Sequence, residues 1–261
     1  MTRISFLAAG AVAVLCVSSG CTTGSGSGTG GVPKAVTTAV ADPARTQADR
    51  DADAARKPAE SVAFAGVKAG DKVVDLWPGG GYFTRIFSLV VGPKGHVYAA
   101  PLPKRPNAPA GAPDPAAAVT AIAADPHFGN VSVLTFRAPD LTVPELVDVI
   151  WTSRNYHDFH NMPNDTVTQI DKTMFNLLKP GGTFVVLDHA AEPGSGARDT
   201  QKLHRIDPEI VKKEVLAAGF VFVGSSDVLH DTSDPHTAAI FDGSVRGKTD
   251  QFILKFRKPK K

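Results

Sequence analysis

The sequence predicts an α/β fold: a doubly wound, seven-stranded sheet that is mostly parallel, with an antiparallel last strand and helices on both faces. Short apolar runs alternate with segments of helical periodicity from residue 72 to residue 223, which is typical of parallel strands joined by helices. A polar loop without a helix separates the last two strands, so we expect these two to pair in antiparallel fashion. With 43% hydrophobic residues, the chain of 261 residues can bury one sizeable core.

The strands are expected where β-branched and aromatic residues gather between turn signals. The first strand carries Asp75 near its end and leads into the glycine turn Gly79–Gly81. The second strand ends at Ala100, and a proline-rich surface loop follows it. The predicted strands are residues 73–76, 96–100, 131–136, 147–152, 183–188, 220–223 and 251–256.

The helices are expected where apolar residues recur at helical spacing and capping residues flank them. Asn164 or Asp165 can cap one helix, which stops at the Lys179–Gly182 turn. Asp207 is an N-cap followed directly by proline, a combination that opens another helix. The predicted helices are residues 59–65, 82–91, 116–124, 167–178 and 208–218.

The N-terminal residues are typical of an export signal. A basic residue precedes an apolar run that is too short to span a membrane, and small residues stand directly before Cys21. We therefore predict a signal peptide over residues 1–20, a flexible tether over residues 21–45 and a domain over residues 46–261. The N-terminus resembles a bacterial lipoprotein signal, which implies a lipid on Cys21 and a place in the periplasm or cell envelope. Ordinary secretion, with cleavage near Gly20, is the alternative.

Cysteine content and charge exclude several classes of site and partner. Both cysteines, Cys16 and Cys21, lie in the export segment, so the folded part is expected to contain no disulfide and no thiolate metal site. The 28 basic residues nearly balance the 26 acidic ones, which gives no reason to expect a nucleic-acid partner. Membrane contact is expected only through the lipid on Cys21.

The strand, turn and helix around Gly79–Gly81 form the main functional motif. Glycines allow positive φ and let a ligand approach the backbone, where the first N–H groups of a helix point at it. A turn kept tight only for packing is the other interpretation. A nicotinamide dinucleotide site is disfavoured, because it needs a third glycine where Thr84 stands and an acid after the second strand.

Four motifs resemble those of a known family: Val74-Asp-Leu-Trp-Pro-Gly-Gly-Gly-Tyr-Phe-Thr84, Arg154-Asn-Tyr-His-Asp158, Leu178-Lys-Pro-Gly-Gly182 and Lys248-Thr-Asp-Gln-Phe-Ile-Leu-Lys-Phe-Arg-Lys-Pro259. Together with the seven-strand order, they resemble class I S-adenosylmethionine-dependent methyltransferases, whose sheet is Rossmann-like. The resemblance extends from about Arg56 to Pro259. It suggests a bacterial branch of exported methyltransferases.

The resemblance implies S-adenosyl-L-methionine as the cofactor, held by the loop after the first strand. Trp77 departs from the family pattern, because it stands where the family has its first glycine. It either fills space that a cofactor needs or forms one wall of an altered pocket. Ala100 and Pro101 depart as well, since the family has an acid there that accepts hydrogen bonds from the ribose. The implied cofactor-binding residues are Asp75, Trp77, Gly79, Gly80, Gly81 and Tyr82.

A polar and aromatic run, Asn155–His160, follows the fourth strand, at the edge where open α/β sheets bind their ligands. His157 is the predicted general base and Asp158 its orienting carboxylate, and Tyr156 or Asn155 is predicted to position the substrate. The alternative is a loop held by side-chain hydrogen bonds. The sequence contains no recognised metal-ligand spacing such as HExxH, so no metal is predicted.

These observations predict an S-adenosylmethionine-dependent methyltransferase that acts on a small-molecule substrate. The predicted export leads to a second hypothesis, because this cofactor is made in the cytosol. The fold would then be a non-catalytic module of the cell envelope that binds another small ligand.

Overall fold

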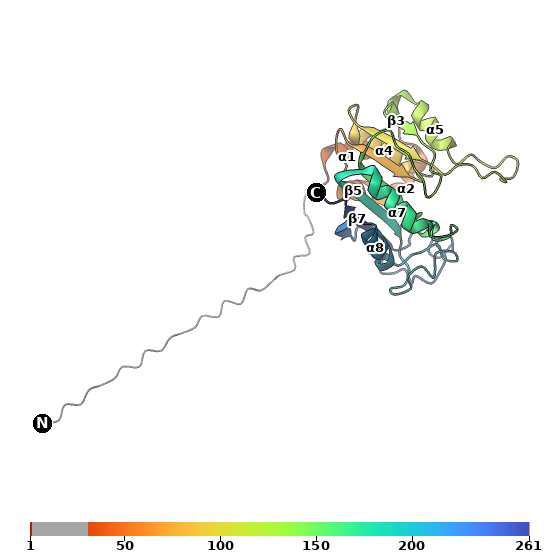
Figure 1. Ribbon diagram of the computed structural model, residues 1–261. Coiled ribbons are helices and arrows are strands. Elements are labelled where there is room, and N and C mark those ends of the chain that lie inside the picture. The colour runs from red at the N-terminus through yellow and green to blue at the C-terminus, as the bar shows by residue number, and fades with distance from the viewer. Residues whose placement is uncertain (2–30, 261) are drawn as a thin grey trace. The chain divides into compact units, whose positions relative to one another are not determined.

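The computed structural model of the chain describes Met1 and residues 31–260 (Figure 1). The predicted signal peptide and the predicted lipidation site, Cys21, lie outside the described residues. The packed unit begins at Val32. Within the described part of the chain, every helix falls short of the length and hydropathy that a membrane span requires.

Seven strands form one sheet, which confirms the predicted fold class. They are β1 (Lys72–Leu76), β2 (His96–Ala100), β3 (Val131–Val133), β4 (Val147–Ser153), β5 (Leu178–His189), β6 (Val221–Ser226) and β7 (Gln251–Arg257). Their order in the sheet is β3-β2-β1-β4-β5-β7-β6. The pairs from β3 to β5 are parallel, whereas β7 runs antiparallel to both β5 and β6. The last strand is therefore antiparallel, as the sequence predicts.

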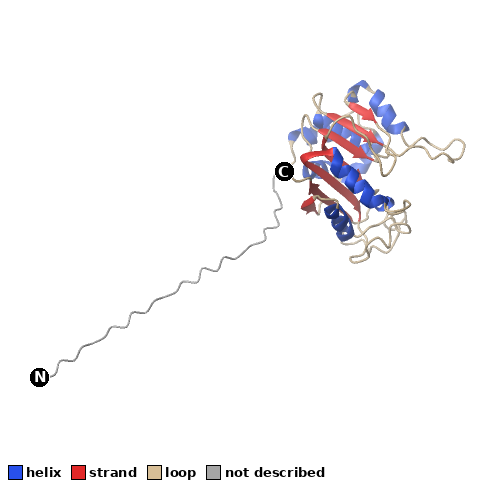
Figure 2. Ribbon diagram, in the orientation of Figure 1, coloured by secondary structure: helices blue, strands red, loops and turns tan. Residues whose placement is uncertain are grey.

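Helices cover both faces of the sheet (Figure 2). They are α1 (Lys34–Val40), α2 (Gln47–Arg56), α3 (Pro58–Ala65), α4 (Tyr82–Val91), α5 (Ala117–Ala124), the 3-10 helix η1 (Pro126–Phe128), α6 (Tyr156–Phe159), α7 (Thr166–Leu177) and α8 (Pro208–Ala217). The buried side chains of α1, α3, α4 and α5 form one hydrophobic core. Those of α6, α7 and α8 form a second core on the opposite face, so the sheet is doubly wound.

The folded domain begins earlier than the sequence predicts. α1 lies inside residues 21–45, the segment predicted as a flexible tether. Val36 and Ala39 stand three residues apart on one face of this helix, and both are buried in the core that α4 shares. The burial of this apolar face makes α1 part of the domain, so the predicted tether does not extend over it.

Three neighbouring strands end at the same edge of the sheet. β1 ends at Leu76, β4 at Ser153 and β5 at His189, and all three run parallel. The segment after β4 contains the short helix α6, where the sequence suggests only a polar run. This edge carries the residues that the sequence singles out.

Candidate active site

A cavity of about 350 Å³ lies at the carboxyl ends of β1 and β4. The glycine turn after β1 forms one wall, residues 153–155 form a second, and α2 contributes a third through Asp49 and Arg56. All predicted cofactor-binding residues except Gly81 border this cavity, and so does Asp158. Its volume lies in the range of small-molecule sites. We call it the first cavity.

The three glycines of the turn have different roles. Gly79 has a φ of 57°, and a Cβ at Gly79 or Gly80 would meet open space. The backbone of both residues is therefore accessible from the cavity. Gly81, the N-cap of α4, has a φ of 76°, and a Cβ there would collide with the Ile122 side chain of α5. Gly81 is thus required for packing, and the structure does not place it among the residues that line the cavity.

Trp77 adopts a backbone conformation that suits glycine. Its φ is 54°, in the left-handed region that large residues rarely occupy. Its ring stacks on Phe159 with centroids 6.1 Å apart and packs against the core on the α7 face. The residue still borders the first cavity. Trp77 therefore lines the cavity next to the glycine turn.

Asp75 lies at the base of the first cavity and is 2% exposed. Its Oδ2 accepts a hydrogen bond of 2.6 Å from the Thr84 hydroxyl. Burial raises the pKa of Asp75 to about 7, against the lowering effect of that hydrogen bond. The neutral form of this carboxyl group therefore persists to a higher pH than in an ordinary aspartate.

Tyr82 fastens α2 to the turn. The Tyr82 hydroxyl donates a 2.6 Å hydrogen bond to Asp53, and the Arg56 guanidinium lies 4.5 Å from the centre of the Tyr82 ring. A second link joins Arg85 of α4 to Asp49 at 3.1 Å. The first cavity thus depends on α2, whose contribution the sequence does not predict.

The end of β2 brings no acid to the site. Ala100 is fully buried, and its carbonyl oxygen accepts a 3.0 Å hydrogen bond from the Trp77 backbone N–H. Neither Ala100 nor Pro101 borders the first cavity. The end of β2 therefore supplies no acid to the first cavity, as the sequence indicates.

A second cavity, of about 700 Å³, adjoins the first. Both are lined by Ala52, Arg56, Arg154 and Asp158. The second cavity also reaches the end of β5, the start of β7 and the loop before α8. Its further polar lining comprises His157, His189, His204, Arg246, Thr249 and Gln251.

His157 is held by Asp188, not by Asp158 as predicted. Asp188 Oδ1 lies 2.9 Å from His157 Nδ1, whereas Asp158 Oδ1 lies 3.6 Å from the other ring nitrogen, Nε2. Burial opposes the charged form of His157, but the Asp188 carboxylate outweighs it and raises the pKa of the imidazole. Burial would likewise raise the pKa of Asp188, and the contacts with His157 lower it overall. His157 also lines the second cavity, although its side chain is only 2% exposed.

Tyr156 borders neither cavity, so its predicted role in positioning a substrate is wrong. The side chain is fully buried in the core on the α7 face. Its hydroxyl lies 2.9 Å from Asp171 Oδ2 and 3.2 Å from Glu214 Oε2. Successive residues of the short helix α6 point in different directions, which separates Tyr156 from His157 and Asp158.

Two half-buried arginines, Arg56 and Arg154, line both cavities and give their junction positive charge. Arg154 donates to Gln251 Oε1 at 2.8 Å, and Arg56 lies over the Tyr82 ring, so both guanidiniums contact neutral groups. Burial, together with the neighbouring Arg56 charge, lowers the pKa of Arg154 to about 10. The sequence assigns no role to either residue, although Arg154 directly follows β4 at the ligand-binding edge. The pair forms a ready site for an anion.

No family model matches the chain. A curated relative is the ubiquinone/menaquinone biosynthesis C-methyltransferase UbiE of Vibrio cholerae, which is 29% identical over 157 residues. The match covers 55% of this chain, and the chain spans about half the length of that relative, 52%.

Solved structures resemble most of the chain. A SAM-dependent methyltransferase from Aquifex aeolicus has a TM-score of 0.56 at 18% identity, covering 76% of this chain and 88% of its own. The [4+2]-cyclase SpnF has a TM-score of 0.57 at 19% identity, covering 82% of each chain. The glycopeptide N-methyltransferase MtfA, solved with S-adenosyl-L-methionine, has a TM-score of 0.51 at 14% identity, covering 77% of this chain and 86% of its own. With the strand order β3-β2-β1-β4-β5-β7-β6, these similarities show that the chain has the class I S-adenosylmethionine-dependent methyltransferase fold.

Proposed function

We propose that the protein is an S-adenosylmethionine-dependent methyltransferase that acts on a small molecule. The observation that carries the proposal is the open backbone of Gly79 and Gly80 on a cavity at the carboxyl ends of β1 and β4. The partial similarity to a C-methyltransferase supports the same class of reaction. The alternative hypothesis, a non-catalytic binding module, is not favoured by these relatives.

The residues of the first cavity fit the amino-acid end of this cofactor. That end carries an α-carboxylate and an α-ammonium group. Arg56 and Arg154 supply cationic partners for the carboxylate, and Asp49 and Asp75 supply acidic partners for the ammonium group. The ribose end lacks the usual acid, because β2 ends in Ala100. We therefore expect the affinity to depend on the amino-acid end and on Trp77.

The cofactor, when bound, supplies an electrophilic methyl group on a sulfonium. The chain's own part is to bind, align and exclude water, since methyl transfer depends largely on the alignment of the two reactants. Trp77 shields one side of the cavity, and α2 covers another. These two walls hold the reacting groups away from solvent.

The acceptor is proposed to be a small anionic molecule in the second cavity. Arg56, Arg154 and Arg246 line that cavity and favour a carboxylate, phosphate or acidic hydroxyl. His157 lines the same space, with Nδ1 tied to Asp188. His157 is therefore positioned to take a proton from the acceptor, as the sequence predicts for this residue.

We also propose that the domain works in the cell envelope, held by a lipid on Cys21. The support is the basic, apolar and small-residue pattern of the first 21 residues. The predicted partners are then the small substrate and the membrane, with the lipid as the only membrane contact.

Calorimetric titration of the purified chain with S-adenosylhomocysteine and S-adenosylmethionine tests the proposal. We expect saturable binding, and we expect Gly80→Val to abolish it by filling the cavity. Gly224→Val in β6 is the matched control, because a Cβ at Gly224 also meets open space and the residue has no positive φ. A chain that binds neither compound at millimolar concentration is not a methyltransferase.

A further inference from the structure

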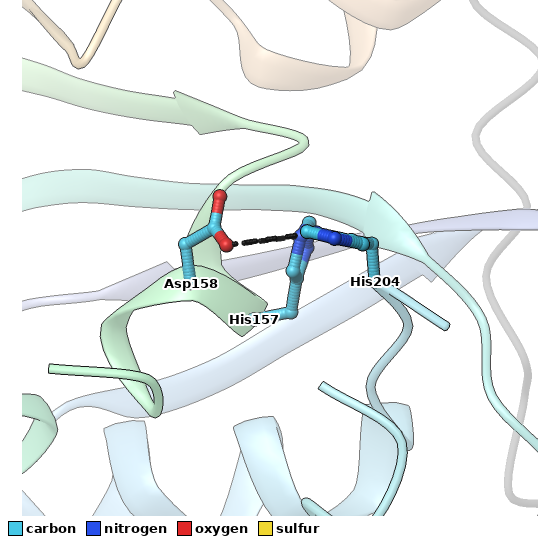
Figure 3. Close-up of side chains that lie close together, drawn as sticks. All are labelled: His157, Asp158 and His204. Carbon is cyan, nitrogen blue, oxygen red and sulfur yellow. Dashed lines mark ion pairs between the residues drawn. The ribbon is translucent and has the colours of Figure 1, made fainter. Parts of the chain in front are cut away.

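Three metal-ligating side chains converge on the second cavity, apart from the glycine turn. His157 and Asp158 come from α6, and His204 comes from the loop that precedes α8 (Figure 3). Their candidate ligand atoms all lie within 4.8 Å of one another. Residues almost 50 positions apart in the chain thus meet at one point, next to the junction with the first cavity.

The spacing of these atoms leaves room for an ion. His157 Nε2 lies 3.6 Å and His204 Nδ1 lies 3.7 Å from the same oxygen, Asp158 Oδ1. Both separations exceed the length of a good hydrogen bond. Ligands that sit about 2.1 Å from a tetrahedral ion are about 3.4 Å apart, so the observed separations suit coordination better than direct bonding.

Asp188 prepares His157 as a ligand. Its Oδ1 holds His157 Nδ1 at 2.9 Å, and its Oδ2 accepts the backbone N–H of His157 at 2.8 Å. A hydrogen bond of this kind fixes the tautomer in which Nε2 carries a free lone pair. The carboxylate that orients a metal-bound histidine in many metalloproteins is therefore already in place.

His204 is held in an unusual conformation at the same point. Its φ is 55°, which is uncommon for a residue other than glycine. Its ring packs edge-on against His157, with centroids 5.4 Å apart, and against Phe241 at 5.0 Å. Backbone strain of this kind persists where the surroundings impose it, and such residues gather at functional sites.

We propose that His157, Asp158 and His204 bind one divalent transition-metal ion, with coordination positions left open toward the second cavity. Two imidazole nitrogens and one carboxylate oxygen suit Fe²⁺, Co²⁺, Ni²⁺ or Zn²⁺, whereas Mg²⁺ and Ca²⁺ prefer oxygen ligands. The sequence predicts no metal, because the ligands come from two distant segments and match no known spacing.

The ion would also bind the acceptor in the proposed methyl transfer. This role of the ion rests on the proposed function. An acidic hydroxyl or carboxylate of the acceptor would occupy an open coordination position. A metal-bound hydroxyl has a lowered pKa and releases its proton to water, so His157 would act as a ligand and not as the base. Asp158, which borders both cavities, would place the bound acceptor beside the first cavity.

Metal binding is tested on the full chain, untagged and stripped with a chelator. Cys16 and Cys21 are replaced by serine so that their thiols cannot bind the probe. Titration with Co²⁺ alone is expected to give visible d–d absorption that saturates at one ion per chain. Zn²⁺ should displace Co²⁺, and Mg²⁺ at the same concentration should not.

The variants assign the signal to the three ligands. His204→Asn should weaken Co²⁺ binding at least 100-fold, and asparagine tolerates the positive φ at this position. Asp188→Asn should weaken it about 10- to 100-fold through the loss of the orienting bond. His127→Asn, which changes an exposed histidine outside both cavities, should have no effect. Asp158→Asn replaces His204→Asn if that variant shows an altered near-ultraviolet circular dichroism spectrum.

Two results would overturn the metal site: no saturable Co²⁺ binding by the parent chain, or equal affinity in the parent chain and in a folded His204→Asn or Asp158→Asn variant. Binding of S-adenosylhomocysteine is measured on the same samples. Saturable Co²⁺ binding without nucleoside binding would keep the metal site and reject the methyltransferase proposal. The reverse pattern would reject the metal site alone.

Discussion

Asp188 holds His157 with both of its carboxylate oxygens: one accepts the imidazole Nδ1 at 2.9 Å, and the other accepts the backbone N–H at 2.8 Å. The first oxygen also accepts the backbone N–H of His189 at 2.8 Å. Both ends of this contact are buried, so the hydrogen bonds are shielded from water. One carboxylate at the end of β5 thus sets the position of the first turn of α6.

We predict that Asp188→Asn destabilises the protein by about 1–3 kcal/mol. The amide nitrogen would replace one carboxylate oxygen, and a buried N–H group of His157 would then have no acceptor. Urea unfolding at pH 7 measures this loss. Asp140→Asn, which changes an exposed loop carboxylate, is the control and should change little. An Asp188→Asn variant as stable as the parent would show that the contact with His157 contributes nothing to folding.

The buried carboxyl of Asp75 predicts a specific pH dependence. Its pKa of about 7 in the folded chain lies above the value of 3.8 of an ordinary aspartate, so folding takes up a proton between these values. The contribution of Asp75 to stability is complete below pH 3.8, falls by up to about 1.4 kcal/mol per pH unit as the pH rises to 7, and then levels off. The Asp75→Asn variant lacks this pH-dependent contribution to stability.

Urea unfolding of both proteins across pH 4 to 9 checks the prediction. The stability of Asp75→Asn relative to the parent should increase up to about pH 7 and stay constant above it. Parallel pH profiles for the two proteins would mean that the carboxyl group has an ordinary pKa.

Two glycines of one turn should respond differently to alanine. At Gly79 only the positive φ opposes a side chain, so Gly79→Ala should cost about 1 kcal/mol. Gly81→Ala adds a collision with Ile122 and should cost about 1–3 kcal/mol more. The double variant Gly81→Ala, Ile122→Val should recover part of the loss. Equal unfolding free energies for the two single variants would contradict the assigned packing role of Gly81.

The Tyr156→Phe variant tests whether Tyr156 acts in the core or in the candidate site. The Tyr156 hydroxyl donates a hydrogen bond to the fully buried Asp171. Its loss leaves that carboxyl group without this partner and should destabilise the protein by about 1–3 kcal/mol. Binding of S-adenosylhomocysteine should be unchanged, because Tyr156 borders neither cavity. A variant with normal stability and lost binding would show that the Tyr156 hydroxyl contributes to ligand binding.

Cys21→Ser tests the lipid anchor. The parent protein should sediment with membranes after cell fractionation, and the variant should be released into the soluble envelope fraction. A Cys16→Ser variant changes the other cysteine and should stay with the membranes. Equal distribution of parent and Cys21→Ser would favour ordinary secretion.

Local patterns were sufficient to predict the sheet. Apolar runs of strand length and the loop before β7 led to the correct strand number and the correct direction of the last strand. The lengths of β3 and β5 were less predictable. Leu178 already pairs with Val147 across an irregular register, where the sequence predicts the last residue of a helix.

The candidate site was only partly predictable, because its walls come from distant segments. Gly79 and Gly80 have a local signature, and the structure places both at a cavity. Arg154 reaches Gln251, 97 residues away, and no spacing in the sequence indicates that contact. His204 joins His157 only through the path of the loop before α8. Such convergence depends on tertiary packing, which local periodicity does not encode.

Because of its position, Trp77 can report ligand binding in the first cavity through its fluorescence. The chain has two tryptophans, and they differ in access. Trp77 borders the first cavity, whereas Trp151 is fully buried and packs against Phe83 and Phe87. A ligand that enters this cavity should change the emission of Trp77 and leave that of Trp151 constant. The fluorescence of the unmodified protein can therefore reveal which small molecules occupy the cavity.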